Sequence, residues 1–168
     1  IIYNSGEANS VTIREFAKEA CDALGMRLVD ITGSTTVEMV TSLNAQIKDV
    51  DAIYIGTDNT AASSIQSISK VALREKIAIV AADIDIASSG GLIGFGFNYY
   101  QIGRATGELV VQILKGASPS ELETKILGQD SLILFVNTDI AEEIGIEIPQ
   151  SVLDLANIVV TNGVETER

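Results

Sequence analysis

The sequence contains no histidine and no tryptophan, and it has a single cysteine, Cys21, among 168 residues. Without histidine, His-based catalysis and histidine metal sites are excluded. One cysteine excludes an internal disulfide. Because Cys21 lies on the apolar face of a predicted helix, we expect a small core residue rather than a reactive thiol.

Basic residues are also scarce, since 11 Lys and Arg stand against 23 Asp and Glu, for a net charge of −12. This balance argues against nucleic acid as a partner, because phosphates select Lys and Arg, and against an anionic membrane surface. No apolar run is long enough to span a bilayer. With 46% hydrophobic and 20% charged residues, the composition is that of one globular domain with a sizeable core.

The first 25 residues predict a strand, a polar turn and a helix. Ile1–Tyr3 is β-favouring, Asn4–Ser10 is rich in turn and capping residues, and Gly25 stands where helices end. The helix between them has an apolar face of Ile13, Phe16, Ala17, Ala20, Cys21 and Leu24. The chain opens inside this strand without Met or a signal peptide, so we expect a fragment or processed product, whose compartment the missing leader does not reveal.

Strand and helix patterns then alternate along the chain. The predicted strands are Ile1–Tyr3, Met26–Ile31, Ala52–Gly56, Ile77–Ala82, Leu92–Phe97 and Leu132–Val136. Helical spacing fills most of the intervals, while Ser88–Gly91 reads as a flexible connection and Val159–Arg168 as a fraying tail. The alternation predicts an α/β fold in three layers, α/β/α, with a parallel sheet and helices on both faces.

Polar residues concentrate in the four turns that follow the carboxyl ends of the first four strands. These turns are Asn4–Ser10, Thr32–Thr36, Thr57–Thr60 and Asp83–Ser88. Helix capping accounts for one such residue per turn, but it does not require Asp58 with Asn59, or Asp83 with Asp85. In open parallel sheets, ligands bind beyond the carboxyl ends of the strands, so the pattern predicts a small-molecule site at this edge.

Four segments resemble one known family. They are YNSGEANS at Tyr3–Ser10, YIGTDNT at Tyr54–Thr60, GFGFNYYQIGRATGELVVQILKG at Gly94–Gly116 and NTDIAEEIGIEIPQSVLD at Asn137–Asp154. The chain resembles the substrate-binding proteins of ABC transporters linked to aromatic amino acids, especially tryptophan. Such proteins close two α/β lobes of the type I periplasmic-binding-protein fold on a ligand like a clamshell.

The resemblance implies that this chain is the C-terminal portion, one lobe of the clamshell. Its partners would be a missing N-terminal lobe, a transporter permease and a small amino-acid ligand. It also implies an exported protein, usually a lipoprotein in Gram-positive bacteria, whose anchoring cysteine would lie in the missing part and would not be Cys21. No cofactor and no metal are expected.

By position, the resemblance places the ligand contacts in three of the polar turns. The predicted site residues are Ser5, Glu7, Ala8, Asn9, Ser10, Asp58, Asn59, Asp83 and Asp85. An amino acid's carboxylate suits the free N–H groups where the first helix begins, with Asn9 and Ser10 as further donors. Its ammonium suits Asp58 or Asp83, whereas Glu7 could pair with the ammonium or favour the helix dipole. Ile84 departs from the smaller residue that relatives often carry between the two acids.

The resemblance also divides the chain into three parts. Residues 1–97 would be the ligand-binding lobe, 98–131 a crossover helix and loop belonging with the missing lobe, and 132–168 a return strand, C-terminal helices and tail. The helix at Tyr99–Lys115 would then lack its partner. We expect it to pack on a second copy, to swap, or to fold back on its own sheet.

Two other functions share parts of this pattern. The effector domain of a repressor has the same clamshell fold. Asp83-Ile84-Asp85 resembles the acidic pocket of a receiver or a metal-dependent phosphotransfer domain, but the chain has no P-loop, no nucleophile elbow and no Lys in its fifth strand. We therefore predict binding without catalysis.

Overall fold

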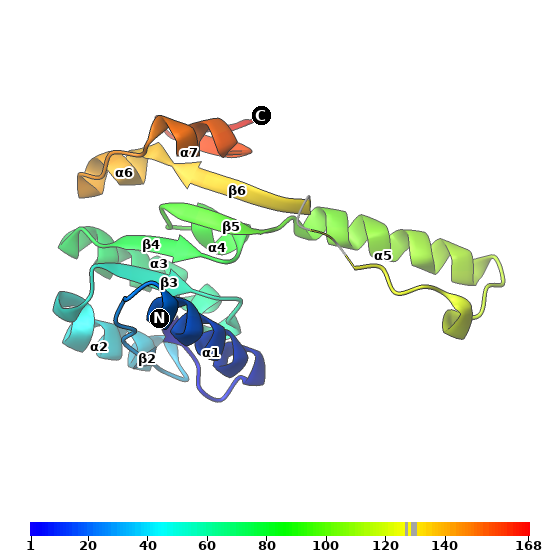
Figure 1. Cartoon of the computed structure of the whole chain (residues 1–168), viewed down its shortest axis with the longest axis horizontal. Helices are drawn as coiled ribbons and strands as arrows, with labels where there is room; N and C mark the ends of the chain where they lie inside the picture. The colour runs from blue at the N-terminus through cyan, green and yellow to red at the C-terminus, as the bar shows by residue number, and fades with distance from the viewer. Residues whose placement is uncertain (127, 129–130) are drawn as a thin grey trace.

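The computed structural model describes residues 1–126, 128 and 131–168. These residues form an eight-stranded sheet in the order β2-β1-β3-β4-β5-β6-β7-β8 (Figure 1). The strands are β1 (Ile2–Tyr3), β2 (Ile31–Thr32), β3 (Ala52–Ile55), β4 (Ala78–Ala81), β5 (Ile93–Phe97), β6 (Leu132–Asn137), β7 (Ile158–Thr161) and β8 (Val164–Glu167). The helices are α1 (Ala8–Ala23), α2 (Thr36–Gln46), α3 (Asn59–Glu75), α4 (Ile84–Ser88), α5 (Tyr99–Leu114), α6 (Thr138–Ile144) and α7 (Gln150–Leu155), with short 3₁₀ turns at Ile47–Asp49 and Pro119–Glu121.

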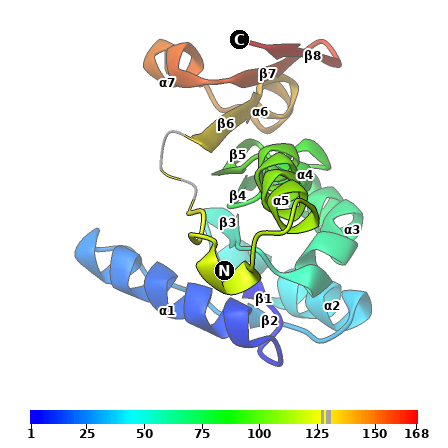
Figure 2. The ribbon, with the colours of Figure 1, turned by 90° about the vertical axis from the view of Figure 1, so that its right-hand side faces the viewer.

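The predicted α/β/α architecture is confirmed. Helices α2, α3 and α4 lie on one side of the sheet, and α1 and α7 on the other (Figure 2). The largest hydrophobic cluster joins β1, β3 and β4 to α2 and α3, with Leu43, Ile55 and Ile68 fully buried. Strands β2, β1, β3, β4 and β5 are parallel, so their carboxyl ends share one edge, from which α5 projects.

The sheet is mostly parallel, as predicted, but its C-terminal side contains two antiparallel pairs. Strand β6 runs antiparallel to β5, and β8 runs antiparallel to β7. The chain leaves the sheet at the end of β5 and returns from the same edge, so the returning strand must run in the opposite direction. Length alone could not distinguish this return from another crossover.

The predicted fraying tail is a β-hairpin. Asn162 and Gly163 form its turn, with φ angles of 54° and 71°. Two successive positive φ angles are the requirement of a type I′ hairpin turn, for which Asn-Gly is a strong signal. Both carboxylate oxygens of Asp139 accept hydrogen bonds from the turn, each 2.7 Å from the backbone nitrogen of Asn162 or Gly163.

Three local expectations are corrected. In the predicted second strand only Ile31 pairs, because β2 covers Ile31–Thr32. The predicted turn Asp83–Ser88 forms the short helix α4. Asp83 caps this helix by accepting a hydrogen bond from the nitrogen of Ile86 (3.0 Å). Helix α1 does not bury its apolar face: Phe16 is 64% and Leu24 70% exposed, and Cys21 is half-buried.

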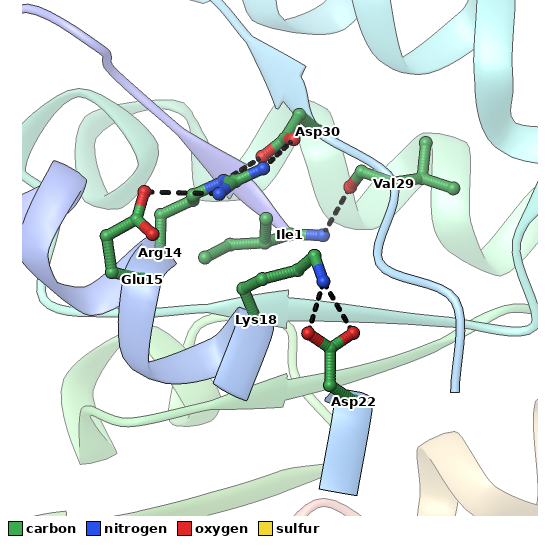
Figure 3. A network of polar contacts seen from close by, with 7 residues as sticks. All are labelled: Ile1, Arg14, Glu15, Lys18, Asp22, Val29 and Asp30. Carbon is green, nitrogen blue, oxygen red and sulfur yellow. Dashed lines mark hydrogen bonds and ion pairs between the residues drawn. The ribbon is translucent and has the colours of Figure 1, made fainter. Parts of the chain in front are cut away.

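An ion pair ties α1 to the segment that leads into β2 (Figure 3). The Nε and Nη2 atoms of Arg14 donate to the two carboxylate oxygens of Asp30 over 2.8 and 2.6 Å. Hydrogen bonds from Arg14 outweigh partial burial, so the pKa of Asp30 lies below its ordinary value. This two-point contact joins α1 to the segment before β2 by charge-assisted hydrogen bonds.

Replacing Asp30 with Asn is expected to reduce thermal stability at neutral pH, with the deficit disappearing in acid. The folded-state pKa is depressed, so the carboxylate stabilises the fold above its unfolded pKa, near 4, and this stabilisation is lost as the pH falls through the folded pKa. Unfolding followed by circular dichroism at pH 7, 5, 4 and 3 measures the difference. Asp22→Asn is the control, because the exposed Lys18–Asp22 pair contributes little; a pH-independent Asp30→Asn deficit would contradict the account.

Helix α5 projects from the body of the molecule (Figures 1 and 2). None of its residues is buried, and Val110, Val111 and Leu114 are exposed. The expectation that α5 folds back on its own sheet is therefore wrong; packing on a second copy and swapping stay predictions, as does the assignment of segment 98–131 to a missing lobe. Residues 127, 129 and 130 of that segment lie outside the described residues. No helix in the described part of the chain has the length and apolar character to cross a bilayer.

Candidate functional site

A cavity of about 480 Å³ opens at the carboxyl edge of the sheet, between α3, α4 and the start of α5. Its lining combines polar and acidic side chains with a few apolar ones. The lining residues are Asn9, Thr57, Asp58, Asn59, Ala62, Ile65, Asp83, Asp85, Ile86, Ser89 and Tyr99. The cavity thus brings together five of the nine predicted site residues: Asn9, Asp58, Asn59, Asp83 and Asp85.

Asp58 connects two of the turns. Its side chain is only 2% exposed. One carboxylate oxygen accepts from the nitrogen of Ala61 and caps α3, and the other accepts from the nitrogen of Asn4, each over 2.7 Å. Because both oxygens already accept from backbone groups, Asp58 holds the β1 turn against α3, and little of it faces a solute.

Glu7 also links the turn after β1 to the start of α3. Its carboxylate accepts hydrogen bonds from the side chain of Asn59 (2.8 Å) and the hydroxyl of Thr60 (2.9 Å), and from the backbone nitrogens of both. Partial burial raises the pKa of Glu7, but these hydrogen bonds outweigh it, so the pKa lies below its ordinary value. Glu7 therefore complements the N-terminus of α3 rather than that of its own helix.

The carboxylates of Asp83 and Asp85 accept fewer hydrogen bonds within the fold than those of Asp58 and Glu7. One oxygen of Asp83 caps α4, whereas the exposed carboxylate of Asp85 accepts no hydrogen bond from the described residues. Both line the cavity. Asp85 supplies the negative charge that is most open to a cationic partner, whereas Asp83 is only 8% exposed.

The remaining predicted residues lie at the start of α1. Asn9 lines the cavity and donates from its amide to the carbonyl oxygen of Thr57 (2.7 Å). Ser5 and Ala8 are exposed and, like Glu7 and Ser10, do not line it. Ser10 is buried, and its hydroxyl oxygen has no hydrogen-bond partner among the described residues. The roles of these residues in ligand binding stay predictions.

Sequence reasoning missed Tyr99 as a lining residue. It is the first residue of α5, and only Asn98 separates it from the end of β5. The rule that selected the other turns, position after the carboxyl end of a parallel strand, applies to Asn98 and Tyr99 as well. The turn after the predicted strand Leu92–Phe97 has the same position relative to its strand as the four turns considered above.

Comparison with known proteins identifies the family. The family model of ABC transporter substrate binding proteins matches residues 1–160. The chain belongs to this family. It is 30% identical over 142 residues to a tyrosine-binding protein of Clostridioides difficile (strain R20291). This match covers 82% of this chain and 40% of that protein.

Two solved structures support the membership of this substrate-binding protein family. A conserved domain protein of Vibrio cholerae superposes with a TM-score of 0.86 at 33% identity, over 95% of this chain and 53% of that one. An ABC domain of Streptococcus pneumoniae in complex with L-Trp superposes with a TM-score of 0.85 at 31% identity, again over 95% and 53%. The chain therefore spans about half the length of these relatives.

The matched family is one of substrate-binding proteins. Among the described residues, no group of three or more Cys, Asp and Glu side chains converges as a metal site would require.

Proposed function

We propose that the chain is one lobe of the extracytoplasmic receptor of an ABC importer and that it binds an amino acid, with an aromatic side chain, without altering it. The missing lobe, the permease and a lipid anchor belong to the same proposal. The tyrosine-binding relative and the tryptophan-bound structure support the choice of solute.

The observation that carries the proposal is a difference in hydrogen bonding among the acidic residues at this edge of the sheet. Asp58 and Glu7 are occupied by hydrogen bonds that hold the fold, whereas Asp85 and one oxygen of Asp83 are available in the same cavity. An ammonium group pairs with Asp85 and Asp83 by charge-assisted hydrogen bonds. The solute's carboxylate is directed to Asn9 and the free N–H groups where α1 begins.

Replacing Asp85 with Asn is expected to weaken amino-acid binding about tenfold, because a charge-assisted hydrogen bond becomes a neutral one. Calorimetric titration with L-tyrosine and L-tryptophan measures this. Asp51→Asn is the matched control, since Asp51 is an exposed acid directly before β3, at the opposite edge of the sheet.

The ammonium group is tested with 3-(4-hydroxyphenyl)propionate, which is L-tyrosine without its amino group. We expect it to bind at least tenfold more weakly than L-tyrosine. Equal affinity for the two compounds, or an Asp85→Asn variant that binds as tightly as the unaltered protein, would overturn the proposed function.

A further inference from the structure

Tyr99 occupies a fixed position at the point where α5 leaves the sheet. The side-chain oxygen of Asn98 caps the helix by accepting from the nitrogens of Tyr100 (2.9 Å) and Gln101 (3.4 Å). The cap and the end of β5 together hold the backbone of Tyr99 beside the carboxyl edge of the sheet. Its side chain is 53% exposed, so it is not committed to the hydrophobic core.

Tyr99 supplies the aromatic surface of the binding cavity. It lines that cavity together with Asp83 and Asp85. With Asp85 it also lines a neighbouring cavity of about 410 Å³, so both residues are shared by the two spaces. Partial burial, the negative charge of Asp83, hydrogen bonding of the Tyr99 hydroxyl to Asp83 and the negative charge of Asp85 all raise the pKa of that hydroxyl. The hydroxyl therefore stays neutral at physiological pH and lies near both carboxylates.

We propose that Tyr99 is a specificity-determining residue that holds the solute's ammonium group between its aromatic face and the carboxylates of Asp83 and Asp85. This inference rests on the proposed function and deepens it. The negative face of an aromatic ring attracts a cation, and partial desolvation beside two carboxylates strengthens that attraction. The combination selects solutes with a primary ammonium group over neutral or anionic ones.

The test compares four variants by calorimetric titration with L-tyrosine and L-tryptophan. Tyr99→Phe keeps the aromatic face, Tyr99→Leu keeps apolar bulk without it, and Tyr99→Ala removes both. Tyr100→Ala is the matched control, because Tyr100 is the next residue, is 70% exposed and does not line the binding cavity. Thermal unfolding of each variant confirms that the fold is retained.

We expect Tyr99→Leu and Tyr99→Ala each to weaken binding about tenfold, Tyr99→Phe to stay within about threefold of the unaltered protein, and Tyr100→Ala to stay within about twofold. Equal affinities for Tyr99→Leu and Tyr99→Phe would overturn the inference, because packing alone would then explain the ring. So would equal losses in Tyr99→Ala and Tyr100→Ala, or no loss in Tyr99→Ala.

The two proposals fail differently. If Asp85→Asn weakens binding while the Tyr99 variants do not, the proposed function stands and the inference about Tyr99 fails. If the unaltered protein binds neither amino acid, both fail together.

Discussion

Replacing Asp58 with Ala is expected to lower the free energy of unfolding by about 3 kcal/mol, one of the two largest effects that we predict. The substitution removes the cap of α3 and leaves the backbone N–H groups of Asn4 and Ala61 without the acceptors they have at 2.7 Å. Buried donors without partners carry the full cost of their lost hydration. Urea denaturation measures the loss, with an unchanged m-value.

Asp58→Asn is the informative companion variant. Its single carbonyl oxygen can serve one of the two donors, so we expect a loss of intermediate size. If Asp58→Ala changed the free energy of unfolding by less than about 0.5 kcal/mol, the structural role of this carboxylate would be refuted. Asp58 would then be available as an ammonium partner, as the sequence alone allowed.

Replacing Gly96 with Ala is the second variant with a large expected effect. A Cβ atom at this position would lie 2.4 Å from the carbonyl oxygen of Ala82 and 3.0 Å from its carbonyl carbon. Both atoms are backbone, so β5 must move away from the end of β4, and we expect a loss of about 2–3 kcal/mol in the free energy of unfolding. Since Asp83 follows Ala82, the shift should also weaken solute binding.

Gly107→Ala is the control for this prediction. Gly107 lies inside α5, and no heavy atom would approach its added Cβ within 4 Å. Alanine favours the helix, so we expect α5 to gain about 0.5–1 kcal/mol. A Gly96→Ala variant as stable as the unaltered protein would show that the β4–β5 approach is not close.

The fold was predictable where local pattern and tertiary packing agree. Buried Ile55 and Ile68 lie on the strand and helix that their spacing indicates, because helices on one face enclose β3 and β4. The pattern failed for α1, whose apolar Phe16 and Leu24 stay exposed, since periodicity reports which face a helix has and not what covers it. It failed also at the C-terminus, where the Asn162-Gly163 turn, a strong hairpin signal, joins β7 to β8.

The site was predictable in position but not in the roles of its acids. Strand order places the turns after β1, β3 and β4 at one edge, so Asn9, Asp58 and Asp83 could be grouped from the sequence. An acid has a structural role when its carboxylate accepts hydrogen bonds from a turn that is distant in the sequence. Asp58 accepts from Asn4 and Glu7 from Thr60 in this way. The sequence carries no signal for those pairings, and capping propensity alone could not distinguish Asp58 from Asp85.

The most direct measurement is a crystal structure of the protein with bound L-tryptophan. The account predicts that the solute lies in the cavity between α3, α4 and Tyr99, with its ammonium nitrogen about 3 Å from a carboxylate oxygen of Asp83 or Asp85. A solute outside this cavity, or one whose ammonium group contacts Asp58 or Glu7 instead, would contradict it.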